Sequence, residues 1–226
     1  RDIGVTGVQT CALPISGIPT ARLISGSASN FTTAMLLILE SHPIQYRVPV
    51  YQCMERLRAG AGKVIFGTDG SVRGQHDTGF GRAVRWDVPL LSGYTFQVLH
   101  NQRGDSLAHR SSLHGRGIAK LLQREHPTAL LLNGLVYHLD FAAYFAALRL
   151  GIPIWLRSET QDQAFSRSPL KSALRQLCYR ALYRPLRRAF FIGELNRRHL
   201  LRHGVQPERL RPAPYCVADQ IGRAHV

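Results

Sequence analysis

The sequence predicts an α/β fold in which helices wind around a parallel sheet. Short apolar runs alternate with helix-length segments through residues 35–219, which is the pattern of strands joined by helical crossovers. The 45% share of hydrophobic residues is enough for a sizeable core in a chain of 226 residues. No internal repeat is visible in the sequence.

Each expected strand is a short apolar run. We expect strands at residues 36–40, 63–67, 96–99, 129–132, 154–157 and 189–192, and a weaker one at 210–213. Helices fit between most of them, at residues 48–58, 117–125, 139–150, 170–183 and 195–203. Gly151-Ile-Pro153 and Gly204-Val-Gln-Pro207 are typical helix ends, with glycine after the last turn and proline just beyond it.

The two ends of the chain are not expected to belong to this fold. Val5 to Ile15 and Gln220 to Val226 resemble translations of the two strands of a common sequencing-library adapter. We therefore expect residues 1–34 to be an adapter-derived and upstream non-native segment without stable structure, and residues 220–226 to be an adapter-derived tail. Residues 35–219 are expected to form one domain.

The domain is strongly basic. Residues 35–219 contain 26 Lys and Arg against 13 Asp and Glu, which favours an anionic partner. No recognisable RNA- or DNA-binding signature accompanies this charge, so nucleic acid is not the favoured partner. Cys53, Cys178 and Cys216 are isolated and odd in number, which predicts neither a disulfide framework nor a zinc site.

The apolar run at Met35–Leu39 is only five residues long before Glu40, too short to span a bilayer. It also lacks the charged start and the cleavage site of a secretory signal. A cytoplasmic location is the natural expectation, with peripheral contact at the inner face of the membrane as a further possibility.

Candidate site residues follow the strands. In a wound parallel sheet, ligands bind in the crevice beyond the carboxyl ends of the strands, where loops converge and helix amino termini present free N–H groups. The loops after four of the expected strands are polar here. A further candidate, Glu194, lies just before the last expected helix. The candidates for this cleft are Ser41, His42, Gln45, Tyr46, Asp69, Asn133, Gly134, Arg157, Glu159, Thr160 and Glu194.

Two of these candidates have alternative explanations. The turn at His42 contains no glycine, so it does not match a dinucleotide-binding turn, and a nicotinamide enzyme is disfavoured. His42 either hydrogen-bonds a substrate hydroxyl or phosphate, or holds its own loop against the sheet. Glu159 is the strongest carboxylate candidate for the crevice, although it and Arg157 also fit a structural ion pair.

The stretch from Thr68 to Tyr94 is too long for a simple connection and is expected to be a structured loop. Trp86 and Tyr94 fit best as anchors that pack this loop. Its aspartates either contact sugar hydroxyls or are solvated turn residues. They are Asp69, Asp77 and Asp87.

The helix expected at 170–183 is amphipathic and basic, with apolar residues at 170, 174, 177, 181 and 182. One interpretation packs the apolar side on the domain and leaves the charges in water. The other brings the basic residues to anionic lipid headgroups, each charge contributing about 1 kcal/mol. The candidate membrane-facing residues are Lys171, Arg175, Arg184, Arg187 and Arg188.

Five motifs occur in order along the domain and together resemble bacterial glycosyltransferases of family 4. They are His42-Pro-Ile-Gln-Tyr46, Phe80-Gly-Arg-x-Val-x-Trp-Asp-Val-Pro-Leu-Leu-x-Gly-Tyr94, Leu156-Arg-x-Glu-Thr160, Ile192-Gly-x-Leu-Asn196 and Pro214-Tyr-Cys-Val217. The resemblance implies a GT-B architecture, in which two Rossmann-like domains face each other across a cleft. This chain would be the amino-terminal, acceptor-side half, without the carboxyl-terminal domain that binds the nucleotide diphosphate sugar.

The resemblance also implies a chemistry. The full-length protein would move a sugar from a nucleotide diphosphate sugar to a glycan or lipid-linked acceptor in cell-surface polysaccharide synthesis, with retention of configuration. No metal or other cofactor is expected. His138 is the candidate for a histidine that touches the donor sugar in this family. No protein nucleophile is expected, because the leaving diphosphate helps deprotonate the acceptor. The isolated half should be inactive, because it lacks the donor site.

Two other functions remain open at this point. Nucleotide-sugar 2-epimerases share the two-domain architecture and differ mainly in the half that is missing here. A non-enzymatic basic binding module is the alternative raised by the charge alone.

Overall fold

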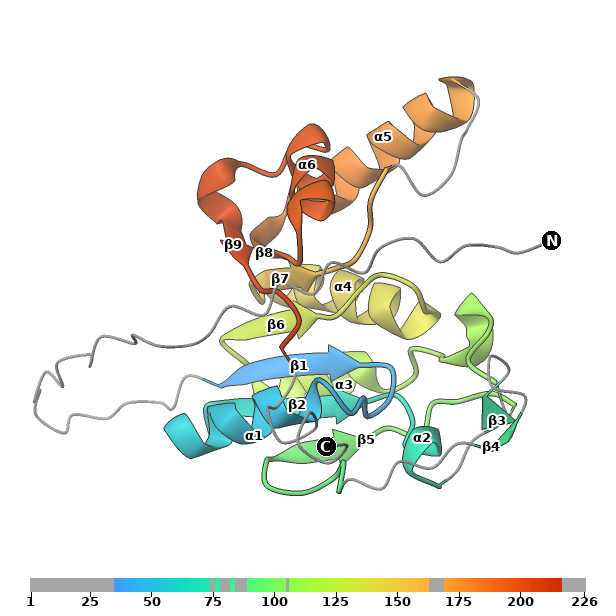
Figure 1. The fold of residues 1–226 in the computed structure, drawn as a ribbon, viewed down its shortest axis with the longest axis vertical. Coiled ribbons are helices and arrows are strands. Elements are labelled where there is room, and N and C mark those ends of the chain that lie inside the picture. The colour runs from blue at the N-terminus through green and yellow to red at the C-terminus, as the bar shows by residue number, and fades with distance from the viewer. Residues whose placement is uncertain are drawn as a thin grey trace, which may run out of the picture. The chain divides into compact units, whose positions relative to one another are not determined.

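The computed structural model describes residues 35–73, 76–77, 82–83, 89–104, 106–162 and 169–216. The two end segments, Trp86 and Asp87 lie outside these ranges, and of Asp77 only the backbone is described. Within them the main feature is a seven-stranded sheet whose neighbouring strands all run parallel, in the order β5-β2-β1-β6-β7-β8-β9 (Figure 1). The predicted fold class is confirmed.

The strands follow the apolar runs closely. Their bounds are β1 Leu36–Glu40, β2 Gly62–Phe66, β5 Phe96–Val98, β6 Ala129–Leu132, β7 Ile154–Arg157, β8 Leu186–Phe191 and β9 Leu210–Pro212. β8 begins three residues before the predicted position. The strand begins at the buried Leu186. It includes Arg187, which is exposed, and Arg188, which is partly buried. The two-residue strands β3 (His76–Asp77) and β4 (Arg82–Ala83) form an antiparallel pair in the long loop.

Five of the described α-helices lie in the predicted segments, and a sixth, short one lies in the stretch expected to be a loop. Their bounds are α1 Val48–Leu57, α2 Gly70–Arg73, α3 Ile118–Glu125, α4 His138–Leu150, α5 Pro169–Tyr183 and α6 Glu194–Arg202, with 3-10 turns at Arg110–Ser112 and Pro207–Arg209. As predicted, α4 ends at Gly151, which adopts a left-handed conformation with φ of 67°.

The two faces of the sheet carry different helices, because successive side chains of a strand point to opposite faces. Ile38 of β1 packs with Tyr51 of α1 in a small core on one face. Leu37 and Leu39 point to the other face, into the larger core that contains α3 and α4. Glu40 has the parity of Ile38, so its side chain lies on the α1 face.

The strand order reverses beside β1. From β1 the chain proceeds outward to β2 and β5, then returns to place β6 on the other side of β1 and continues to β9. The carboxyl ends of β1 and β6 therefore flank a topological switch point, the place where open α/β sheets bind ligands.

Candidate functional site

A buried carboxylate lies at the switch point. Glu40, the last residue of β1, is 2% exposed. It accepts hydrogen bonds from Arg47 Nη1 at 2.6 Å, from Asn133 Nδ2 at 2.8 Å, and from the Tyr51 hydroxyl. Asn133 directly follows β6, and Arg47 and Tyr51 come from the start of α1. The carboxylate thus joins three segments at one point.

Burial dominates the electrostatics of this group. It raises the pKa of Glu40 to about 7, although the Arg47 guanidinium and the Tyr51 hydroxyl both favour the ionised form. The same carboxylate and burial raise the pKa of Tyr51 well above its usual value. Tyr51 therefore stays protonated as a donor.

Arg47 connects the buried carboxylate to an exposed one. Its Nη2 lies 3.6 Å from Glu159 Oε1, while Nη1 bonds Glu40. Its Nε is buried and has no hydrogen-bond partner in the described part of the chain. The guanidinium is held in place but retains an unused donor.

A cavity of about 410 Å³ opens beside this network. It is lined by the loop after β6, at Asn133 and Gly134, and by the loop after β7, at Glu159 and Thr160. Arg47 and Arg157 also line it, and their guanidinium groups repel each other, which together with burial lowers the pKa of Arg157. The cavity is cationic and polar at the strand ends.

A second cleft of about 380 Å³ shares Arg47, Asn133 and Arg157 with the first. Its remaining wall is formed by aliphatic and aromatic side chains. Tyr215 lies edge-to-face on Tyr46 with ring centroids 5.1 Å apart, and its ring also receives the Arg157 guanidinium at 4.7 Å. Arg157 forms no ion pair within 4.0 Å with any carboxylate of the described residues, so its charge is available to a ligand in either cavity.

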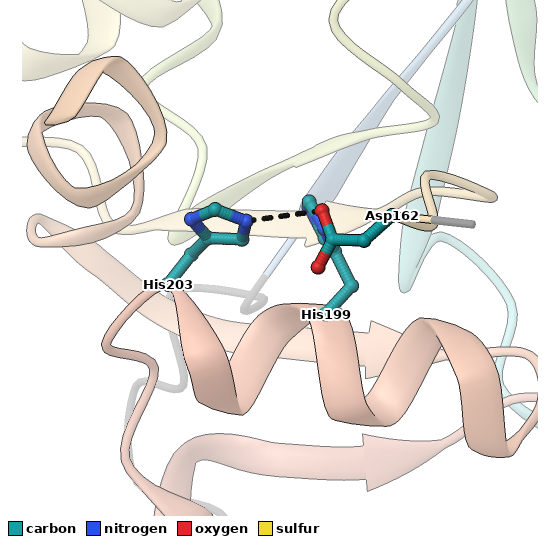
Figure 2. Close-up of side chains that lie close together, drawn as sticks. All are labelled: Asp162, His199 and His203. Carbon is teal, nitrogen blue, oxygen red and sulfur yellow. Dashed lines mark hydrogen bonds and ion pairs between the residues drawn. The ribbon is translucent and has the colours of Figure 1, made fainter. Parts of the chain in front are cut away.

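A separate polar cluster joins α5, α6 and the loop after β7. Asp162, His199 and His203 each offer one atom that could bind a metal ion, and these three atoms lie within 4.8 Å of one another (Figure 2). Two imidazoles and a carboxylate are ligand types that Zn²⁺ takes. However, Asp162 Oδ1 already accepts a hydrogen bond from Arg175 Nη1 at 2.7 Å, and a guanidinium in that position repels a cation. We therefore describe the cluster as a hydrogen-bond network.

Comparison with known proteins gives the fold a context. The sequence matches no protein family and no curated protein. A solved UDP-N-acetylglucosamine 2-epimerase is 12% identical in sequence, with a TM-score of 0.51. The match covers 79% of this chain and 47% of the epimerase chain. The fold of this chain is a Rossmann-like α/β fold like the part of that GT-B-type structure with which it aligns.

Weaker structural matches include the Anabaena protein HepE, solved with UDP and glucose, and MurG of Acinetobacter baumannii. HepE is 11% identical, with a TM-score of 0.49, and the match covers 84% of this chain and 46% of HepE. MurG is 8% identical, with a TM-score of 0.43, and the match covers 84% of this chain and 47% of MurG. The aligned part of this chain thus corresponds to less than half the length of each of these three proteins.

The structure brings several predicted site residues of this chain together. Asn133, Gly134, Arg157, Glu159 and Thr160 all line the first cavity. Their common position follows from the parallel strands β6 and β7, whose carboxyl ends share one edge of the sheet.

Other predicted residues lie elsewhere, and none of them lines the first cavity. Tyr46 borders the second cleft, and Ser41 Oγ lies 2.9 Å from His42 Nδ1 within the turn after β1. Asp69 pairs with Arg73, and Glu194 pairs with Arg198 along α6. Gln45 lies in the same turn as His42, and His138 is exposed in the first turn of α4.

The sequence interpretation missed Glu40, Arg47 and Tyr51. The available signal was a charged residue at the end of a central apolar strand, followed by an arginine and a tyrosine four residues apart at the start of a helix. A carboxylate at the end of a central strand is covered by the neighbouring strands and helices. A buried carboxylate requires hydrogen-bonding partners. The prediction for Tyr94 fits the structure, since its hydroxyl donates to the Leu90 carbonyl at 2.6 Å and its ring packs on Tyr51.

Proposed function

We propose that this chain is the acceptor-side half of a nucleotide-sugar-dependent glycosyltransferase that retains anomeric configuration. The observation that supports this proposal is the cationic cavity at the switch point, where Arg47 and Arg157 accompany Asn133 and Glu159. A nucleotide diphosphate sugar carries two negative phosphates and several hydroxyls. Guanidinium groups match the phosphates, and amide and carboxylate groups match the hydroxyls.

In this proposal the cavity residues orient the reactants. Arg157, which forms no ion pair with a carboxylate of the described residues, contributes a charge for a phosphate of the donor or of a lipid-linked acceptor. Asn133 is held by Glu40 and so presents its amide oxygen in a fixed direction. Glu159 is exposed and can accept from an acceptor hydroxyl.

The buried carboxylate is poorly suited to act as a nucleophile. Glu40 is almost inaccessible and accepts from three donors, so a substrate carbon has no approach to its oxygens. Its role in the proposal is to fix Arg47 and Asn133. Rate acceleration then comes from orientation and from electrostatic stabilisation of an oxocarbenium-like transition state, with the leaving diphosphate as the base.

A nucleotide-sugar 2-epimerase half is the second candidate. It is favoured by the fold match to the UDP-N-acetylglucosamine 2-epimerase, which aligns with 79% of the chain. Both candidates require a second Rossmann-like domain and a UDP-sugar, and they differ in the fate of the sugar.

One assay separates the two candidates. A protein that carries this chain together with a second Rossmann-like domain in the same reading frame would be incubated with single UDP-sugars, with and without saccharide acceptors, and followed by NMR. The glycosyltransferase proposal expects acceptor-dependent UDP release and a product with the donor's anomeric configuration. Acceptor-independent conversion of the sugar to its C2 epimer would establish the epimerase instead, and neither reaction with any UDP-sugar would refute both.

A further inference from the structure

The outward face of α5 is apolar. Leu170, Leu174 and Leu177 are 81%, 62% and 67% exposed. Their spacing of four and three residues places them on one side of the helix. Ala181 extends this stripe by one more turn and is also exposed. The interpretation in which the helix packs these leucines on the domain is therefore wrong.

The inward face of α5 is held to the domain by hydrogen bonds and by packing of its tyrosines on the core. Arg175 donates to Asp162 at 2.7 Å and places its guanidinium 4.7 Å from the Tyr179 ring. The Tyr183 hydroxyl lies 3.1 Å from His199 Nε2, and His199 Nδ1 donates to the same Asp162 oxygen at 2.9 Å. Figure 2 shows how Asp162 lies against the imidazoles of α6.

This bonding sets the orientation of the helix. Turning the leucines inward would expose Tyr183, which is buried, and would break the bonds of Arg175 and His199 to Asp162. Three exposed leucines are also unfavourable in water compared with leucines buried in a core. The bonds to Asp162 hold the apolar stripe toward solvent, and such an exposed apolar stripe is typical of a surface that binds a partner.

The rim of the stripe is cationic. Lys171, Arg180 and Arg184 are exposed along the helix and just after it. The fifteen residues of α5 include no Asp or Glu. Arg175, predicted to face the same way, is instead directed to Asp162, while Arg187 and Arg188 belong to β8, where Arg188 Nη1 donates to the Glu208 carbonyl.

We propose that the outward face of α5 binds the surface of an anionic lipid bilayer. The leucines enter the boundary between headgroups and acyl chains, and the three cations pair with lipid phosphates. A second copy of this chain fits poorly, because apposed α5 helices would bring two basic rims together. None of the helices in the described residues is long and apolar enough to cross a membrane. This binding is independent of the function proposed for the cavity.

Vesicle sedimentation tests the proposal on the whole chain. We expect binding to vesicles of phosphatidylglycerol and phosphatidylcholine, and little binding to phosphatidylcholine alone. Leu174→Gln with Leu177→Gln should weaken binding at least about tenfold, because two inserted side chains lose their apolar surface. Arg180→Glu with Arg184→Glu should weaken it at least about twentyfold.

A matched control separates a local site from net charge. Arg56→Glu with Arg58→Glu makes the same charge change at exposed positions at the end of α1 and should keep most of the binding. Circular dichroism would show that each variant folds. Equal weakening by the two charge variants, or full binding by the leucine variant, would overturn the proposal. So would a concentration-dependent dimer that the leucine variant abolishes in a chain that does not bind vesicles.

Discussion

Asn133 donates a hydrogen bond of 2.8 Å to Glu40 from 93 positions further along the chain. The bond crosses the switch point between β1 and β6, where the strand order reverses. It joins the loop that lines the cavity to the carboxylate that holds Arg47. The position of the candidate site is thus tied to the topology of the sheet.

Substitution of Glu40 tests the buried carboxylate. Its pKa in the folded protein is about 7 against 4.5 as the ordinary value, so between these values the folded state holds more protons than the unfolded state. The free energy of unfolding must therefore fall as pH rises from 4.5 to 7, by about 3 kcal/mol for this group. We expect Glu40→Gln to reduce that fall by a similar amount.

Urea unfolding at pH 5 and pH 8 measures this difference. Asp140, whose pKa is raised to about 6 by burial, contributes equally to both proteins and cancels in the comparison. An unchanged fall between the two pH values in Glu40→Gln would show that the carboxylate is not the buried, titrating group.

Substitution of Asp162 tests the anchor of α5. The histidines of α6 and Arg175 lower the pKa of Asp162 to about 2. This carboxylate therefore contributes stability above its ordinary pKa of 3.8, and the contribution is lost as pH falls through about 2. Because solvent reaches the group, we expect Asp162→Asn to lower the free energy of unfolding at pH 7 by about 1 kcal/mol from this effect, and more if the bonds to α5 are lost.

The matched control for Asp162 is Asp69→Asn. Asp69 also has a lowered pKa and an arginine partner, but the partner Arg73 is exposed. We expect little change in urea unfolding for this variant. Equal destabilisation by the two substitutions would contradict the anchoring role of Asp162.

Gly115, just before α3, packs closely against Ala142 of α4, and this contact predicts the effect of Gly115→Ala. A β-carbon at Gly115 would lie 2.1 Å from the Cβ of Ala142, a severe overlap between two packed segments. We expect a loss of about 1–3 kcal/mol in the free energy of unfolding. Gly193→Ala is the control, because φ there is −158° and nothing lies within 4 Å of the added carbon. That variant should stay within about 0.5 kcal/mol of the parent.

Arg157→Met tests the available charge of the cavity. In a protein that carries both Rossmann-like halves, we expect kcat/KM to fall at least about tenfold, because a charge-assisted hydrogen bond to the substrate is lost. Thermal unfolding should change little, since among the described residues Arg157 has a cation–π contact with the Tyr215 ring and one hydrogen bond, to the Ala213 carbonyl. Arg116→Met, at an exposed position that does not line the cavity, should keep full activity.

The sheet could be predicted because the apolar runs mark its strands directly. Leu36–Glu40, Ala129–Leu132 and Ile154–Arg157 begin and end where the sequence pattern places them. Asn133 and Glu159 could also be predicted as neighbours, because the carboxyl ends of parallel strands share an edge.

The partners of these residues could not be predicted. Whether Arg47 reaches Glu40 depends on which face of β1 is covered by α1, and this is decided by packing between elements. In the same way, helical periodicity identifies the stripe that contains Leu174 but does not say whether it points inward. The direction of the stripe is decided by hydrogen bonds to Asp162. One comes from Arg175 of α5, 13 positions after Asp162, and another comes from His199 of α6, 37 positions after Asp162.

The most direct test of the central claim is an amide NMR titration, with UDP-N-acetylglucosamine, of a protein that carries this chain together with the second Rossmann-like half. The account predicts that the largest shift changes occur at Asn133, Gly134, Glu159 and Thr160, and that Arg157→Met weakens them. Changes confined to residues away from the switch point, or none at millimolar ligand, would contradict the assignment of this edge of the sheet as the ligand-binding rim.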